Sequence, residues 1–140
     1  MASNSISEAD KAKMFDYLKE YQENIKKNFG EYDIMNKKLL KFLSTNDIFI
    51  GRMNKKCIEK SKRHQYYMLF EQDKPRNKDN DVAHHLLRHI RNSIAHGRID
   101  KKGNVFFKLE DYSTNGLTKT MIGLLNYKLF FELIDQLQNT

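Results

Sequence analysis

Two arginines, two histidines and an asparagine stand close together in the segment RHIRNSIAHG, residues 88–97. Histidine both accepts and donates a proton near neutral pH, and arginine binds a phosphate through two parallel hydrogen bonds. With an asparagine as a neutral orienting group, these residue types can cleave RNA without a metal ion. A base takes the proton of the 2′-hydroxyl, the oxygen attacks the adjacent phosphorus, and a cation stabilises the charge that develops. The segment is therefore a candidate site for metal-independent phosphodiester cleavage.

A helix predicted over residues 82–96 positions these side chains, because Asp81 can cap its start and Gly97 can end it in the left-handed conformation. At about 100° per residue, the apolar side chains gather on one face and the polar ones on an opposite stripe. The apolar face holds Ala83, Leu86, Leu87, Ile90 and Ile94, and the polar stripe holds His85, His89, Asn92 and His96. We expect the two faces to be cleanly separated.

Arg91 lies outside this polar stripe, at about 140° from His96 on an ideal helical wheel. One helix cannot easily direct both side chains at one phosphate, although the length of arginine recovers part of the angle. A second copy of the chain, related by a two-fold axis, would bring the Arg91 of one protomer to the His96 of the other. The sequence therefore predicts a homodimer.

Other interpretations of these residues stay open. His85 and His89 could chelate zinc from one helix face, with His96 or an acid from elsewhere as third ligand. No HExxH pattern is present, however, and Cys57 has no partner at ligand spacing. The histidines could also be ordinary surface or packing residues, and a nucleophilic Ser93 is disfavoured because it leans toward the apolar face. We expect no metal ion in the site and no cofactor.

The six residues RNSIAH, 91–96, stand on the penultimate long helix and are followed by glycine, and they resemble the R-(polar)-x3-H signature of the HEPN superfamily. The resemblance covers this motif and the helical layout of residues 8–138. It implies a small all-α protein of prokaryotic toxin–antitoxin and antiviral systems, with a metal-independent endoribonuclease site at a homodimer interface. Carried over by position, it implies Arg91 as phosphate or transition-state contact, Asn92 as orienting group and His96 as general acid or base.

The same resemblance leaves several roles open. Three neighbouring residues could extend the site or be bystanders, namely His85, Arg88 and His89. Some toxin members carry a tyrosine two residues past the histidine, which a partner nucleotidyltransferase modifies, whereas this chain has Arg98 there. An antitoxin protein of that type stays a candidate partner, although this chain lacks the tyrosine that it would modify. Many members bind RNA, nucleotides or proteins without cutting, so a non-catalytic HEPN-like module is the alternative to a ribonuclease toxin or defence effector.

Positive charge is concentrated in the middle of the chain, whose formal net charge is +7. Residues 37–63 hold nine Lys and Arg against Asp47 and Glu59. A basic surface of this kind attracts the phosphates of RNA, and unpaired strands or loops expose the bases and 2′-hydroxyls. The residues expected to hold the RNA backbone are Lys55, Lys56, Lys60, Lys62 and Arg63. A solvated, lysine-rich surface is the alternative.

Hydrophobic periodicity predicts the remaining elements. Helices are expected from Ser7 to the stop at 28–30, over 32–44, over 54–70, over 82–96 and from 113–114 to 137, with a loop over 71–80 and residues 48–51 left undecided. Lys-Lys-Gly-Asn between two strand-like segments predicts a small β-hairpin near residues 98–110. We therefore expect an all-α, up-and-down bundle of four to five helices with one hairpin insertion, forming a single domain over residues 1–140.

No window of the sequence is long and apolar enough to span a bilayer, and the polar start lacks a signal-like apolar stretch. The single cysteine, Cys57, cannot close an intrachain disulfide. We expect a cytoplasmic protein with no membrane partner.

Overall fold

The computed structural model describes residues 6–28, 31–71, 82–103 and 105–140. These residues form five α-helices, one π-helical turn and five strands. In chain order the elements are α1 (Glu8–Glu20), η1 (Tyr21–Ile25), α2 (Lys37–Thr45), β1 (Ile48–Arg52), α3 (Lys55–Ser61), β2 (Tyr66–Phe70), α4 (Val82–Ala95), β3 (Ile99–Lys102), β4 (Phe106–Tyr112), β5 (Lys119–Asn126) and α5 (Tyr127–Gln138). Apart from Glu71, the loop predicted over 71–80 lies outside the described residues.

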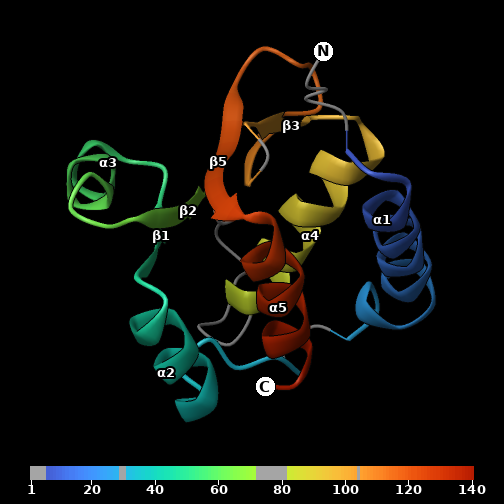
Figure 1. The fold of residues 1–140 in the computed structure, drawn as a ribbon, viewed down its shortest axis with the longest axis horizontal. Helices are drawn as coiled ribbons and strands as arrows, with labels where there is room; N and C mark the ends of the chain where they lie inside the picture. Colours follow the sequence, from blue (N-terminus) through green and yellow to red (C-terminus); the bar gives the residue numbers. More distant parts are fainter. Residues whose placement is uncertain (1–5, 29–30, 72–81, 104) are drawn as a thin grey trace.

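The five strands form one mixed sheet in the order β1-β2-β5-β4-β3 (Figure 1). Strands β1 and β2 are parallel, and the other neighbouring pairs are antiparallel. The all-α bundle predicted from the sequence is therefore wrong, because the chain has an α/β fold in which helices pack against a sheet. Two segments that were expected to be helical account for the difference.

The first of these segments is β5, the central strand of the sheet. Met121, Gly123 and Leu125 are buried on one face of β5, while Ile122 and Leu124 are half-buried on the other. A central strand covered on both faces is apolar throughout, so the alternation typical of a half-exposed strand is missing. The spacing of its apolar residues also fits a helix, which made the prediction of one long helix from 113–114 to 137 wrong in its first half.

The second segment is β2, which lies in the helix predicted over 54–70. Only the first half of that prediction is correct, as α3, whose start is capped by Asn54 Oδ1 accepting from the backbone N–H of Cys57 at 2.8 Å. Asp47 then accepts a 2.8 Å hydrogen bond from the backbone N–H of Gln65 and fixes the turn into β2. The aromatic residues that follow have a high strand propensity, and they form β2 beside the parallel β1.

Other predictions are confirmed. The first helix is present as α1 and continues into η1. The second helix is present as α2, although it begins after Asn36 rather than at residue 32. The hairpin is present as β3 and β4, which pair from Ile99–Leu109 to Lys102–Phe106. The segment 48–51, which the sequence left undecided, lies in β1.

Helix α4 packs against strand β4 and against α1, and these contacts bury most of its surface (Figure 1). On the α1 side, the hydroxyl of Tyr17 donates a hydrogen bond of 2.5 Å to the carbonyl of Leu87. Burial raises the pKa of Tyr17 well above its ordinary value, so that this phenol stays a donor. Helix α3 lies at the other end of the sheet, beside β1 and β2. Among the described helices, none has both the length and the apolar character needed to cross a bilayer.

Candidate functional site

The histidines of α4 are mostly inside the protein. His85 and His89 are each 2% exposed, Asn92 is half-buried, and only His96, just beyond the helix, is exposed. The expected separation into a buried apolar face and an opposite polar stripe is therefore wrong for the first two turns. The physical reason is that α4 is covered on more than one side, so part of its polar stripe faces strand β4 rather than solvent.

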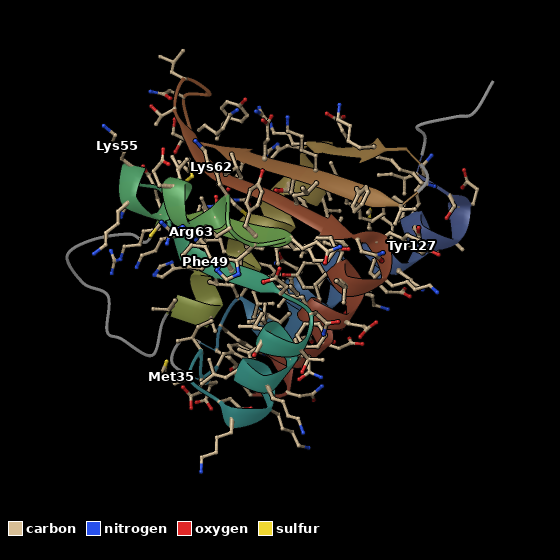
Figure 2. All side chains as sticks on the ribbon, turned by 60° about the vertical axis from the view of Figure 1, so that its left-hand side comes forward. Met35, Phe49, Lys55, Lys62, Arg63 and Tyr127 are labelled. Carbon is tan, nitrogen blue, oxygen red and sulfur yellow. The ribbon has the colours of Figure 1, made fainter. Side chains whose placement is uncertain are left out.

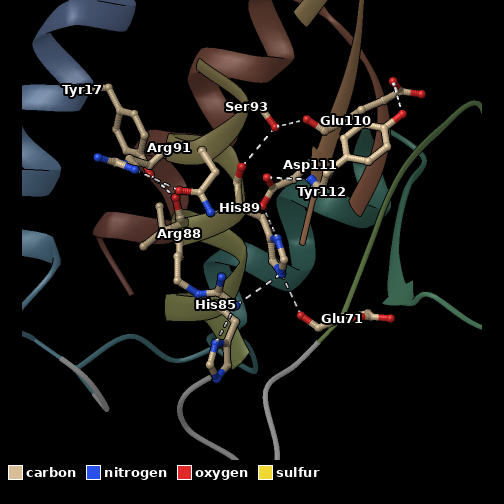
Figure 3. A network of polar contacts seen from close by, with 12 residues as sticks. Tyr17, Glu71, His85, Arg88, His89, Arg91, Ser93, Glu110, Asp111 and Tyr112 are labelled. Carbon is tan, nitrogen blue, oxygen red and sulfur yellow. Dashed lines mark hydrogen bonds and ion pairs between the residues drawn. The ribbon is translucent and has the colours of Figure 1, made fainter. Parts of the chain in front are cut away.

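A buried ion pair links α4 to β4. Nδ1 of His89 lies 2.8 Å from Oδ2 of Asp111, and Nε2 of His89 lies 2.7 Å from the carbonyl oxygen of Glu71 (Figure 3). Both partners are acceptors, so a ring that makes both bonds carries a hydrogen on each nitrogen. Arg88 Nη2 is farther from Nε2, at 3.4 Å, and a protonated Nε2 cannot accept from it. His89 and Asp111 then form an imidazolium–carboxylate pair.

The carboxylate of Asp111 is held in its charged form. Burial raises its pKa, but hydrogen bonds from His89 and Asn92 and from the backbone N–H of Tyr112 outweigh this effect, and the net pKa is lowered. The N–H of Tyr112 donates to Oδ1 at 2.8 Å, which leaves Oδ2 for the residues of α4. Asp111 is thus a fixed negative charge beneath the polar side of the helix.

Asn92 connects this charge to Arg91. Its Nδ2 donates to Oδ2 of Asp111 at 3.1 Å, and its Oδ1 accepts from Nη1 of Arg91 at 3.0 Å. The two contacts fix the orientation of the amide, because its nitrogen must point to the carboxylate and its oxygen to the guanidinium. Arg91 itself lies on the α1 side, with its guanidinium carbon 6.0 Å from the ring centroid of Tyr21 (Figure 3 shows it beside Tyr17). The arginine side chain is therefore long enough to reach Asn92, but it does not reach the cleft that His96 lines.

A cleft of about 640 Å³ opens beside the polar side of α4. One wall comes from the C-terminal half of α4 and the residues just beyond it, and the other from β4 and its connection to β5. Its lining residues are Glu71, Arg88, His89, Asn92, His96, Arg98, Asp111, Tyr112, Ser113, Thr114, Gly116 and Thr120. The structure thus brings Asn92 and His96 to one cleft, together with the site-extending Arg88 and His89. Arg91 and His85 do not line it.

The end of α4 is anchored to β4, which fixes the position of His96. The backbone N–H of Arg98 donates to the carbonyl of Ser93 at 2.8 Å, and the Ser93 hydroxyl donates to the carbonyl of Glu110, also at 2.8 Å. Ser93 is fully buried and so has no access to a substrate. Gly97, at φ 66°, makes the turn that leaves His96 and Arg98 at the lip of the cleft.

The predicted RNA-holding residues lie elsewhere, on α3 and the turn after it. Lys55, Lys56, Lys60, Lys62 and Arg63 are all exposed. Figure 2 shows Lys55, Lys62 and Arg63 on the side of the molecule formed by α3. None of the five lines the cleft, but Arg52 at the end of β1 pairs with Phe70, and the next residue, Glu71, does line it. Helix α3 therefore begins shortly after the C-terminal end of β1, which lies beside the C-terminal end of β2. The residue that follows β2, Glu71, lines the cleft.

Sequence reasoning missed Asp111, although a signal for it existed. Phe107, Leu109 and Asp111 alternate along β4 on its buried face. A carboxylate at a core position of a strand needs a buried partner, and the nearest candidates by chemistry were the histidines of α4. Tyr112 and Arg98, which also line the cleft, carried no comparable signal.

In the part of the chain that the structure describes, no group of three or more His, Cys, Asp or Glu is arranged to hold a metal ion, so no zinc-ligand cluster is present there. Both ring nitrogens of His89 are engaged by Asp111 and Glu71.

The model of the family described as HEPN pEK499 p136 matches residues 9–140, which is nearly the whole chain. Neither the curated proteins nor the solved structures gave a match.

Proposed function

Because the chain belongs to the HEPN pEK499 p136 family, we propose that it is a metal-independent endoribonuclease that acts as a toxin or defence effector. The observation that carries this proposal is the cleft beside α4, in which the exposed His96 shares a wall with an Asn92 amide that Arg91 and Asp111 hold in one orientation. A proton-transfer group, an oriented amide and a cation are the parts that 2′-hydroxyl attack on a phosphodiester requires.

In this proposal His96 takes the proton of the 2′-hydroxyl as its oxygen attacks phosphorus, the P–O5′ bond breaks, and a proton is given to the leaving 5′-oxygen. His96 is the member of the α4 histidines that solvent and substrate can reach, since His85 and His89 are buried. Asn92, which lines the same cleft as His96, orients the reacting phosphate or the adjacent phosphate of the RNA. His89 and Asp111 act through Asn92 as positioning residues, because Asp111 accepts hydrogen bonds from both.

The proposal includes a homodimer. Arg91 is absent from the lining of its own protomer's cleft, although its guanidinium reaches Asn92. Arg91 from a second copy, brought across a two-fold axis, would supply the transition-state cation. The exposed lysines of α3 would bind the flanking RNA backbone through its phosphates.

The test is cleavage of a labelled single-stranded RNA and of a tRNA pool by the purified protein in excess EDTA. Wild type is compared with His96→Ala and Arg91→Ala. His64→Ala is the matched control, because His64 is also an exposed histidine but pairs with Asp47 and lies outside the cleft. We expect cleavage by wild type and His64→Ala, and loss of cleavage in the other two variants.

If wild type cuts neither RNA while all the variants keep its fold, the ribonuclease proposal fails for these substrates. The non-catalytic module that binds RNA, a nucleotide or a protein then becomes the better description. Cleavage that survives His96→Ala would also contradict the proposed role of this histidine.

A further inference from the structure

We infer that Arg98 is the residue that binds a phosphate of the RNA strand inside the cleft of its own protomer, an inference that rests on the proposed function. Arg98 lies two residues past His96 and lines the same cleft. Its main chain is fixed at both ends, since its N–H donates to Ser93 at 2.8 Å and its carbonyl accepts from the N–H of Glu110 at 3.0 Å. The Cα of Arg98 is therefore held in a defined position beside the cleft.

The guanidinium of Arg98 is held by stacking rather than by hydrogen bonds. Its central carbon lies 4.2 Å from the ring centroid of Tyr112, which is close enough for a strong cation–π contact. Tyr112 is itself fixed, because its N–H donates to Asp111 at 2.8 Å and its hydroxyl to Oε1 of Glu110 at 3.3 Å. The contact with a fixed ring restricts where the guanidinium can lie.

These N–H groups have no acceptor within the described part of the chain, where the side-chain contact of Arg98 is the stack on Tyr112. The neighbouring arginine differs in this respect, since Arg91 donates to Asn92 at 3.0 Å. The two nearest carboxylates in β4 are already paired, Glu110 with Lys119 at 2.8 Å and Asp111 with His89 at 2.8 Å. Among the residues that the structure describes, the N–H donors and the positive charge of Arg98 are thus available to an incoming group.

A planar fork of N–H donors matches two oxygens of a phosphate. The other carboxylate that lines the cleft, Glu71, makes no ion pair with Arg98 among the described contacts, so it does not neutralise the arginine. An RNA phosphodiester is the phosphate that reaches this place if His96 acts on the same strand. Arg98 would then fix the strand in cis, while the partner protomer's arginine meets the reacting phosphate.

The experiment measures binding apart from cleavage, with a labelled single-stranded RNA whose 2′-hydroxyls are replaced by fluorine, in EDTA and over a series of salt concentrations. Arg98→Ala should weaken binding by about tenfold or more, and it should lower the slope of log Kd against log salt by about 0.7, the value for one phosphate contact on a single strand. Arg98→Lys keeps the charge but not the fork, so it should keep the slope and recover only part of the affinity.

Lys102→Ala is the control, because it removes one exposed positive charge from the adjacent β3 without touching the cleft. It should bind like wild type. Tyr112→Leu should lose affinity, because the ring that holds the guanidinium of Arg98 is gone. Equal thermal melting of Arg98→Ala and wild type separates lost binding from lost folding.

The inference is overturned if Arg98→Ala keeps the wild-type affinity and salt slope, if Lys102→Ala loses as much, or if wild type does not bind the fluorinated RNA. Displacement of the RNA by low concentrations of inorganic phosphate would show a site for free phosphate and also overturn it. The proposed ribonuclease fails separately: binding that depends on Arg98 without any cleavage of normal RNA supports the inference and contradicts the nuclease. Cleavage that depends on His96, together with wild-type RNA binding by Arg98→Ala, would support the nuclease and contradict the inference.

Discussion

His89 and Asp111 form an ion pair that is buried between helix α4 and strand β4, with 2.8 Å between Nδ1 and Oδ2. The pair ties the middle of α4 to the sheet, and the same carboxylate oxygen accepts from Asn92. One contact therefore serves both the packing of the helix and the orientation of the candidate site. It also explains why polar residues occupy a helix that is largely buried.

Replacement of Asp111 by Asn should destabilise the protein by about 3 kcal/mol near neutral pH, because it leaves the buried imidazolium of His89 without its counter-charge. The pKa of Asp111 is lowered in the folded state, so its ionised form stabilises the fold above the ordinary carboxyl pKa. That contribution is lost as the pH falls toward the lowered folded-state value. The difference in free energy of unfolding between wild type and Asp111→Asn should therefore be fully present above about pH 5 and shrink below about pH 4.

Urea denaturation at a series of pH values measures this difference. Asp100→Asn is the control, since Asp100 is exposed on β3, and its stability curve should follow that of wild type. A difference between wild type and Asp111→Asn that does not change with pH would contradict the ion pair.

The residues that sequence reasoning placed correctly are those governed by local rules. The α4 helix, its end at Gly97 and the β3–β4 hairpin all follow from capping, turn residues and short-range periodicity. The central strand β5 was missed because its apolar residues also fit helical spacing, and because its pairing with β2 joins residues about 50 positions apart. The partner of His89 was missed for the same reason, as Asp111 lies 22 positions further along the chain. Local spacing thus selected the helix of the site and the hairpin beside it, but not the contact between His89 and Asp111 that joins them.

Gly97 offers a test of how the end of α4 positions the site. The N–H of Arg98 bonds to the carbonyl of Ser93 at 2.8 Å and that of Gly97 to Ile94 at 3.2 Å, which is the Schellman arrangement with a left-handed residue at φ 66°. A Cβ added at Gly97 would meet no atom within 4 Å, so the cost of Gly97→Ala comes from the backbone alone. We expect Gly97→Ala to lose about 1–2 kcal/mol in chemical denaturation.

Gly97→Asn should lose less than Gly97→Ala, because asparagine tolerates the left-handed region better. RNA cleavage at a temperature where both variants are folded should fall in the same order, since His96 and Arg98 flank the turn. Equal stability of Gly97→Ala and wild type would mean that the turn does not constrain these two residues.

The basic surface of α3 can be tested by charge reversal. Lys55→Glu, Lys56→Glu and Lys60→Glu combined should weaken binding of single-stranded RNA and reduce its salt slope by about 2, the value for three phosphate contacts. The matched control reverses three exposed lysines of α2, Lys37, Lys38 and Lys41, and changes the net charge equally. If both triple variants lose the same affinity, only the total charge matters and α3 is not the binding surface.

Mixing of two inactive variants tests whether Arg91 and His96 act across a dimer. In a heterodimer of Arg91→Ala with His96→Ala, one of the two composite sites contains both damaged residues and the other contains both native ones. After subunit exchange of equal amounts, half of the dimers are mixed, so up to a quarter of the wild-type activity should return. The recovery falls below that value to the extent that the restored site needs the hydrogen bond from Arg91 to Asn92 of its own chain, which the Arg91→Ala chain lacks. A mixture of His96→Ala with the double variant Arg91→Ala/His96→Ala forms no complete site and should stay inactive. If native mass spectrometry detects the heterodimer but no activity returns, each site takes both residues from one chain, and the position of Arg91 on the α1 side would then have to change on RNA binding.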